Sequence, residues 1–413
     1  MQPNPSTLGD VKLSYRFILL GLISINVFSL LFFPISNTLR EGLYRVNDVW
    51  TLVHIFILGF IIMIVMGVMY QLVPVALLVP IFSNKLSRVQ FWFYAAGVIG
   101  LALSLYFMNT LYILTFGIVT LFGILLFVAN ILLSTKKIIE WNMMSLIIIT
   151  AVIYLFLTVL FGVGLAVNYY NGYWAEYHEN IFYSHLLFGL IGWLSSLIIG
   201  FSYKMVPMFS LAHGYKENYA KYIYLCLQSG IMAIVVGLFT ELVLIRYIGL
   251  FLIITAFILF TIQIREIMRN KMKTRLDIGF TAAVNSIYLT AGLVSIAPLG
   301  FYFWQESFVL PFAYLFITGW IGLSLLGYLF KIVPFLWWTD KYSDRVGKED
   351  VPLLKDMVDE QKGKIAFLLI LSGILGNSLG IGLNLQVIIM ISSLIFMTGG
   401  VLYSFLVLRV FKM

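Results

Sequence analysis

The amino-acid sequence is poor in charge and in cysteine. Asp, Glu, Lys and Arg make up 11% of the 413 residues, whereas a soluble domain carries roughly a quarter of such residues. Because 62% of the residues are hydrophobic, polar groups cannot cover the surface, which excludes a soluble globular protein. The single cysteine, Cys226, excludes an internal disulfide and a cysteine-based metal cluster. Lipid is therefore the solvent that the composition predicts.

Several motifs of soluble enzymes are also missing. The sequence contains no glycine-rich phosphate loop, no nucleophile elbow and no HExxH helix. These absences argue against a soluble-type hydrolase and against a nucleotide-driven transporter. Carboxylates are almost absent from the apolar runs, so a proton pump is not predicted.

The chain does contain twelve apolar runs, each long enough for a membrane-crossing helix of about 20 residues. They lie near 17–35, 51–80, 91–109, 111–133, 143–168, 181–208, 221–241, 247–264, 280–300, 308–335, 364–383 and 386–408. We therefore expect an all-α, polytopic membrane bundle of twelve transmembrane helices, forming a single membrane domain over residues 1–413. No small-residue cleavage site follows the first run, so we expect it to be a retained signal-anchor.

The net charge of +8 is distributed according to this topology. With the N-terminus inside, all of the 26 Lys and Arg residues except Arg40, Arg45 and Arg246 fall on the inner side. This bias is typical of cytoplasmic loops, and a missed span would have reversed every later loop. We predict a multi-pass protein of the cell membrane with both termini in the cytoplasm. The inner surface is expected to attract anionic lipid, and no nucleic-acid partner is expected.

Three spans share one sequence pattern, which indicates an internal repeat. The pattern is Gly, seven residues, Gly, two residues, an aromatic residue, Gln or Lys, one residue, and then Val-Pro. Its glycines and prolines are Gly59, Gly67 and Pro74 in the second span, Gly192, Gly200 and Pro207 in the sixth, and Gly319, Gly327 and Pro334 in the tenth. We predict three pseudo-threefold repeats of four helices, over approximately residues 1–134, 135–270 and 271–413.

The recurring residues predict close helix packing. Glycine lets a neighbouring helix or a flat ligand approach the backbone, and proline near the inner end can kink or end the helix. Gln71, Lys204 and Lys331 stand just before the prolines. The long stems of the lysines are expected to reach the inner interface rather than to form a proton path.

Two polar segments lie between the spans. Residues 339–364 form a cytoplasmic loop of mixed charge that is expected to hold a short surface helix. Residues 169–180 form an outer loop rich in tyrosine and glutamate, for which an interfacial aromatic belt is favoured over a binding surface.

The most distinctive stretch runs from Tyr328 through Lys331 and Pro334 to Tyr342 (YLFKIVPFLWWTDKY), with Val-Pro-Leu-Leu following at residues 351–354. Together with the Gly-Trp pairs of spans six and ten, twelve spans and three four-helix repeats, it resembles subunit I of the haem–copper oxidase superfamily. The similarity is closest to short single-chain members of the C-type oxidase and nitric oxide reductase branch.

In that family, histidines on spans two, six, seven and ten hold two haems and a copper ion. The resemblance places His54, five residues before Gly59, at the position of the low-spin haem ligand. It places His185, seven residues before Gly192, at the position of the single copper ligand of span six. Spans seven and ten contain no histidine, and Phe312 and Tyr314 occupy the repeat positions that correspond to His185 and His54.

These absences separate the architecture from the activity. A three-histidine copper centre is not expected, and the reactive haem lacks an axial histidine, so oxygen or nitric oxide reduction by the family mechanism is not expected. The resemblance implies a b-type haem near the outer leaflet, bound by His54. Its second axial position is left open: vacant, or filled by His185, a methionine or a tyrosine such as Tyr314. The alternative for His54 is a hydrogen bond to another span or a place at the interface.

A second ligand set lies near the outer loop. His178 precedes His185 by two helical turns, so the two can share a helix face. With Glu176 and Glu179 they form a nitrogen–oxygen set for a divalent metal. The alternatives for His185 are haem ligation and a structural or interfacial role.

The sequence thus favours a haem-binding membrane protein, and we assign no catalytic residue to it. Its function would lie in electron transfer, or in sensing or handling haem, copper or nitric oxide, with a respiratory or redox protein as partner. One alternative is a transporter or channel that reuses the fold. Another is an assembly or structural partner of a respiratory complex.

Overall fold

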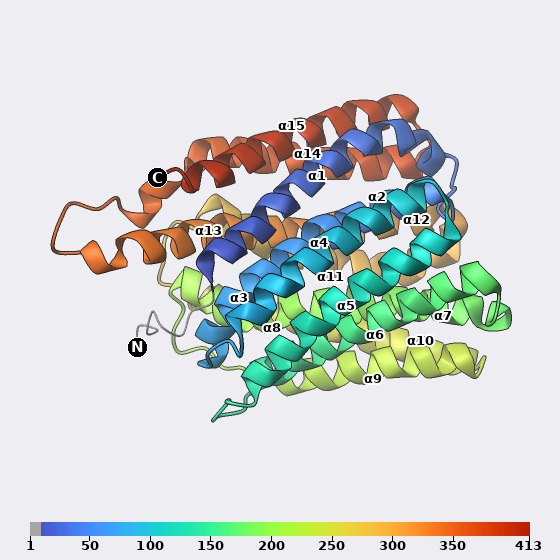
Figure 1. Ribbon diagram of the computed structural model, residues 1–413, viewed down its shortest axis with the longest axis horizontal. Helices are drawn as coiled ribbons and strands as arrows, with labels where there is room; N and C mark the ends of the chain where they lie inside the picture. Colours follow the sequence, from blue (N-terminus) through green and yellow to red (C-terminus); the bar gives the residue numbers. More distant parts are fainter. Residues whose placement is uncertain (1–9) are drawn as a thin grey trace. The chain divides into compact units, whose positions relative to one another are not determined.

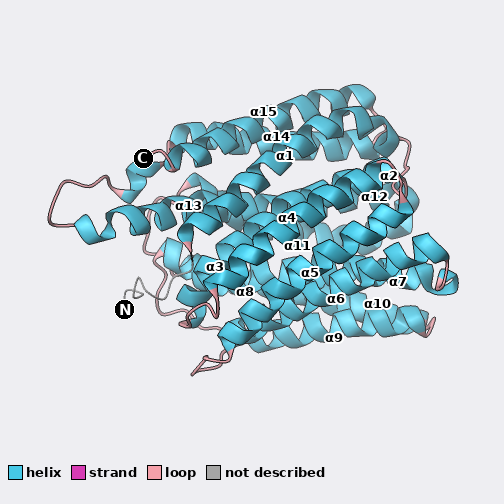
Figure 2. Cartoon of the chain, viewed as in Figure 1, coloured by secondary structure: helices cyan, strands magenta, loops and turns pink. Residues whose placement is uncertain are grey.

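Helices make up nearly all of the regular structure in the computed structural model, which describes residues 10–413 (Figure 1). The one other element in that range is an isolated bridge between Val346 and Glu349. Figure 2 shows helices joined by loops, most of them short. Twelve helical segments are long and apolar enough to cross a membrane, which confirms the predicted all-α polytopic bundle. They are Val11–Arg40, Asn47–Leu77, Asn84–Tyr106, Thr110–Thr135, Met143–Asn171, Ala175–Ser210, Ala220–Phe239, Val243–Arg269, Ile278–Trp304, Glu306–Arg345, Glu360–Gly382 and Gln386–Val410.

The helices pack into two units, which we call unit 1 (residues 72–274) and unit 2 (residues 10–71 and 275–413). Unit 1 contains α4 (Asn84–Tyr106), α5 (Thr110–Thr135), α6 (Met143–Asn171), η3 (Ala175–Tyr177), α7 (His178–Leu187), η4 (Phe188–Ser195), α8 (Ser196–Ser210), α9 (Ala220–Phe239) and α10 (Val243–Arg269). Unit 2 contains α1 (Val11–Arg40), α2 (Asn47–His54), η2 (Ile55–Ile62), α11 (Ile278–Trp304), α12 (Glu306–Tyr314), η5 (Leu315–Gly322), α13 (Leu323–Tyr342), η6 (Ser343–Arg345), η7 (Leu354–Met357), α14 (Glu360–Gly382) and α15 (Gln386–Val410). The helix α3 (Met63–Leu77) runs from unit 2 into unit 1.

The two units follow different boundaries from the predicted repeats, which end near residues 134 and 270. Spans three and four belong to the first repeat in sequence, but they pack in unit 1, where α5 contacts α6 of the second repeat. Packing and sequence repetition therefore divide the chain in different ways, and the single membrane domain over residues 1–413 stays a prediction.

Polar side chains mark the starts of several helices. Each of them accepts a hydrogen bond from the backbone N–H three residues later, which satisfies one of the donors left open at a helix N-terminus. These capping residues are Asp10, Ser83, Asn109, Asn142 and Asp359. Their placement explains why the apolar runs begin as helices at these points.

The three spans that share the sequence pattern also share an irregular backbone. Each contains a π-helical segment of eight residues, namely η2, η4 and η5. At the end of each segment a backbone N–H donates to the carbonyl five residues earlier: Met63 to Leu58, Ser196 to Ile191, and Leu323 to Thr318. The first motif glycine is the fifth residue of every segment. The sequence pattern therefore recurs as a pattern of backbone geometry.

The second glycine of each motif lies against the first span of its own repeat. A Cβ atom on Gly67 would lie 2.4 Å from Phe17 Cβ in α1. One on Gly200 would lie 3.1 Å from Ile147 Cγ2 in α6, and one on Gly327 would lie 2.6 Å from the carbonyl oxygen of Gly279 in α11. These close approaches give the recurring glycines a role in helix packing.

The motif prolines lie inside helices and act differently in the three repeats. The helix α3 ends at Leu77 and α8 at Ser210, and the next residues, Leu78 and Leu211, both adopt a left-handed φ of 55°. The helix α13 instead continues past Pro334 to Tyr342. The predicted helix end thus follows the proline closely in two repeats but not in the third.

The position before the motif Val-Pro also differs between the units. In unit 2, Gln71 Nε2 donates to Ser14 Oγ at 3.0 Å, and Lys331 Nζ lies 2.6 Å from Asp277 Oδ2. In unit 1, Lys204 is exposed, as the interfacial interpretation of this lysine requires. Lys331 therefore bonds to the start of α11, a contact that the spacing of the lysines did not predict.

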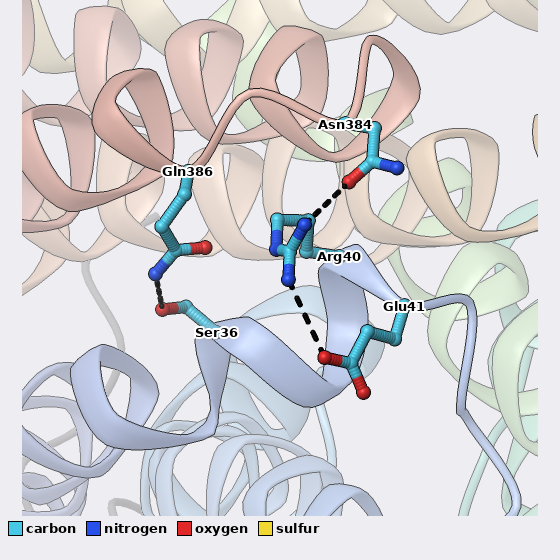
Figure 3. Close-up of polar contacts among 5 residues, drawn as sticks. All are labelled: Ser36, Arg40, Glu41, Asn384 and Gln386. Carbon is cyan, nitrogen blue, oxygen red and sulfur yellow. Dashed lines mark hydrogen bonds and ion pairs between the residues drawn. The ribbon is translucent and has the colours of Figure 1, made fainter.

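The end of α1 is tied to the turn between α14 and α15 in unit 2 (Figure 3). Arg40 Nη1 donates to Asn384 Oδ1 at 3.1 Å, and Arg40 Nη2 donates to Glu41 Oε1 at 3.3 Å. Gln386 Nε2 donates to Ser36 Oγ at 3.3 Å. Arg40, one of the three cations predicted on the outer side, is thus neutralised locally.

The predicted cytoplasmic loop, residues 339–364, is more structured than its polarity indicates. The helix α13 extends into it as far as Tyr342, and η6 follows. The indole of Trp338 donates through Nε1 to the carbonyl oxygen of Pro352 at 2.7 Å. The expected short surface helix is present as the 3₁₀ turn η7.

Candidate functional site

His54 is the last residue of α2 and directly precedes the π-helical segment η2. Its ring is half-buried, and Nδ1 lies 2.7 Å from the carbonyl oxygen of Trp50. A carbonyl oxygen can only accept, so Nδ1 carries the proton and Nε2 is the basic nitrogen of the neutral ring. Histidines that bind metals commonly donate their other ring N–H to a backbone carbonyl in this way. The structure therefore holds His54 in the tautomer that a ligand role through Nε2 requires.

His185 has the same tautomer but a different anchor. Its Nδ1 lies 2.8 Å from the carbonyl oxygen of Thr158, which belongs to the neighbouring helix α6. A Cβ atom on Gly162, also in α6, would lie 3.0 Å from His185 Cε1. The ring is thus fixed between α7 and α6, and its hydrogen bond joins the two helices.

Tyr314 precedes η5 as His54 precedes η2, so the two residues occupy equivalent backbone positions. The Tyr314 hydroxyl accepts a hydrogen bond from Asn377 Nδ2 at 3.1 Å, and Asn377 Oδ1 accepts one from Ser393 Oγ at 3.0 Å. These bonds connect α12, α14 and α15 within unit 2. Tyr314 therefore belongs to a polar network that was not predicted from the sequence, because no motif includes Asn377 or Ser393.

Aromatic rings line this part of unit 2. The Phe28 ring lies 4.6 Å from that of Phe56 and 5.7 Å from that of Phe32, and the Phe32 ring lies 5.5 Å from that of Tyr314. A Cβ atom on Gly322, at the end of η5, would lie 3.0 Å from Phe56 Cζ. The rings thus connect α1 to η2 and to α12. The basic Nε2 of His54 and these apolar rings, all within unit 2, are of the donor chemistry and the polarity that a haem requires.

His178 differs from the other two histidines. Asn168 Oδ1 accepts a hydrogen bond from the backbone N–H of Trp174 at 3.0 Å, which fixes the amide so that Nδ2 faces His178 Nδ1 at 2.9 Å. Because an amide N–H can only donate, Nδ1 of His178 is the acceptor. Its Nε2 lies 3.4 Å from the Tyr169 hydroxyl. The basic nitrogen that a metal would need is therefore already engaged by α6.

The predicted metal set gains no support from this arrangement. His178 and His185 both face α6, as the shared-face prediction requires, but seven residues of helix separate them by a rise of about 10 Å. Glu176 and Glu179 are exposed. Within residues 10–413, no three His, Cys, Asp or Glu side chains are grouped so as to hold a metal ion. Metal binding by His178, His185, Glu176 and Glu179 stays a prediction.

Only some of the hydrogen-bond partners of the histidines could be predicted from the sequence. Trp50 precedes His54 by four residues, so helical spacing alone places its carbonyl beside the ring. Thr158 lies 27 residues before His185, and nothing in the sequence marks this carbonyl as the partner.

No protein family model matches the chain, and no curated protein sequence is significantly similar to it.

Proposed function

We propose that this membrane protein binds a b-type haem through His54 and serves in electron transfer, or in sensing or handling haem, copper or nitric oxide. The proposal includes the haem–copper oxidase subunit I scaffold, with both termini in the cytoplasm and the haem near the outer leaflet of the cell membrane. The three matched π-helical segments support a common repeat architecture. The missing histidines of spans seven and ten argue against the terminal-oxidase reaction.

The observation that carries the proposal is the hydrogen bond from His54 Nδ1 to the carbonyl oxygen of Trp50, at 2.7 Å. It fixes the ring orientation and the tautomer in which Nε2 is the basic nitrogen, at a place where the backbone departs from regular α-helix. Wide turns of this kind occur frequently at functional sites. A backbone carbonyl as partner also raises the basicity of the imidazole toward a metal.

A bound b-type haem supplies a one-electron carrier whose potential depends on its axial ligands and surroundings. The protein would contribute the imidazole of His54, apolar walls from Phe28, Phe32 and Phe56 that exclude water, and a candidate second donor in Tyr314. The Tyr314 oxygen accepts the N–H of Asn377, which would fix the direction of the hydroxyl group. Unit 2 thus offers an imidazole and a tyrosine hydroxyl as candidate axial donors.

An absorption spectrum of the purified protein, expressed with ample haem, tests this function. We expect a Soret band with a pyridine-haemochrome spectrum of the b type. His54→Ala should remove the band, whereas His213→Ala, which changes an exposed loop histidine, should leave it unchanged. Tyr314→Phe should keep the haem bound but shift the band if the phenolate is the second ligand.

The absence of a Soret band in the haem-replete wild-type protein would refute the proposal. So would a spectrum that His54→Ala leaves unaltered. A haem-free protein that still moves a solute across liposome membranes would favour a transporter instead.

A further inference from the structure

One end of unit 1 carries a group of exposed cations. The residues lie near the end of α8, at the start of α9 with the loop before it, and at the end of α10 (Figure 1). We call this surface the basic end of unit 1. Its six exposed cationic side chains are Lys204, Lys216, Lys221, Arg265, Arg269 and Lys271.

Hydrogen bonds between the segments fix the shape of this surface. Gln263, a buried residue of α10, donates through Nε2 to the carbonyl oxygen of Lys216 at 2.7 Å. The Oε1 atom of Gln263 accepts from the backbone N–H of Tyr219 at 3.3 Å. The backbone N–H of Lys273 donates to the carbonyl oxygen of Ser210 at 3.2 Å. The loop from α8 to α9 is therefore held against α10, and the cations are displayed on a fixed frame.

The six cations are not neutralised by the protein itself. Within residues 10–413 none of them forms an ion pair, and only Glu217 and Glu266 add negative charge to these segments. The loop before α14 behaves differently, because there Lys362 pairs with Asp359 at 3.3 Å and Arg345 with Glu349 at 3.4 Å. The backbone N–H of Lys362 also donates to Asp359, which holds the pKa of this carboxyl below its usual value. The excess of cations over carboxylates thus distinguishes the basic end of unit 1 from this loop, where both signs are mixed.

Apolar side chains are exposed among the cations. Leu211 is 53% exposed, Tyr222 59% and Met272 69%. These apolar side chains would not stabilise a bound phosphate ion, and they would not form favourable contacts with the backbone of a nucleic acid. A phospholipid presents an anionic headgroup next to acyl chains, and this is the pairing that cations beside apolar side chains at a helix end can match.

We infer that the basic end of unit 1 binds the headgroup of an anionic phospholipid, with the acyl chains against the neighbouring apolar side chains. Lys216, Arg269 and Lys271 come from the loop and from the end of α10, which the bonds of Gln263 hold together. The positive-inside charge distribution places this surface on the side predicted to be cytoplasmic, where anionic lipids attract basic segments.

The test compares two triple variants of the full-length protein that lose the same net charge. The site variant is Lys216→Gln, Arg269→Gln and Lys271→Gln, and the control variant is Arg345→Gln, Lys348→Gln and Lys355→Gln in the loop before α14. Native mass spectrometry measures retention of phosphatidylglycerol against phosphatidylcholine from micelles that contain both. We expect the site variant to lower the affinity for phosphatidylglycerol at least tenfold and the control to change it less than twofold.

Two further arms keep the result interpretable. A charge-preserving variant, Lys216→Arg, Arg269→Lys and Lys271→Arg, should retain the lipid and shows whether loss of binding is only a folding defect. Inorganic phosphate alone should neither bind measurably nor displace phosphatidylglycerol. Equal losses in the site and control variants, or binding of inorganic phosphate as tight as that of the lipid, would overturn the inference.

Discussion

The first and second repeats contain the same helix with the same π-helical segment, but each places a histidine differently. In the first repeat His54 directly precedes η2 and bonds to the carbonyl of Trp50 in its own helix. In the second repeat the equivalent residue is Leu187, and His185 bonds instead to Thr158 of α6. The residue equivalent to His185 in the first repeat is Leu52, which is 2% exposed.

This difference shows that the same helix can anchor a histidine either to its own backbone or to a neighbouring helix. His185 joins two helices, so its hydrogen bond contributes to packing whether or not anything else binds. His54 satisfies its N–H locally, so no neighbouring helix depends on that bond. The bond of His185 therefore contributes to the packing of α7 on α6, and haem ligation by His54 stays the proposal.

The largest difference in stability between the two repeats is expected when one methyl group is added to the second motif glycine of each. Gly67→Ala should destabilise the protein by about 3 kcal/mol, because its Cβ would lie 2.4 Å from Phe17 Cβ and 3.1 Å from the carbonyl oxygen of Ser14. Gly200→Ala should change stability by less than about 1 kcal/mol. Its Cβ would lie 3.1 Å from Ile147 Cγ2 and from Ile148 Cγ1, so a shift of these side chains by a few tenths of an ångström makes room for it, and alanine favours the helix. Denaturant unfolding in micelles measures both, and equal losses would show that the two repeats pack alike.

Removing each histidine in the haem-free protein gives the next largest effect. His185→Ala should cost about 2 kcal/mol, because the bond between α7 and α6 is lost. His54→Ala should cost less than His185→Ala, because the bond of His54 Nδ1 is made within its own helix. Thermal unfolding of the two variants, purified without added haem, checks the ranking. A larger loss in His54→Ala would contradict the assignment of the structural role to His185.

The smallest effect concerns a feature that the two repeats share. Leu78 and Leu211 both follow a helix end with φ at 55°, a conformation in which a side chain costs energy and glycine does not. Leu78→Gly and Leu211→Gly should each stabilise the protein by about 0.5 kcal/mol, after allowing for the flexibility of glycine in the unfolded chain. Trp338→Gly, at the matching position inside α13, should destabilise it instead. Opposite signs for Leu78 and Leu211 would show that the two helix ends are not equivalent.

More of the fold than of the candidate site could be predicted from the sequence. Long apolar runs must become helices in lipid, because backbone groups have no other partner there, so the twelve spans followed directly. The Gly…Gly…Val-Pro pattern marked the spans that contain η2, η4 and η5. It did not indicate that backbone N–H groups there, as in Phe188–Ser195, bond to the carbonyl five residues earlier instead of four. Helix bounds differed by several residues where caps such as Asp10 and Ser83 lie outside the apolar run.

Contacts between distant segments were the part that could not be predicted. The pairs His185–Thr158, Tyr314–Asn377 and Lys331–Asp277 each join different helices, and their formation depends on how those helices pack. The family resemblance pointed to His54 and His185 by position only. It gave no indication of their hydrogen-bond partners, Trp50 in the same helix for His54 and Thr158 in α6 for His185.

Chemical rescue of His54→Gly tests the central claim most directly. Glycine removes the imidazole and leaves room for a free one, so the variant purified with ample haem should lack the Soret band of the wild type. Added imidazole should then restore the band, while His185→Gly should show the wild-type band with or without imidazole. A His54→Gly variant that keeps its haem spectrum unaided, or that imidazole cannot rescue although the protein is folded, would contradict haem ligation by His54.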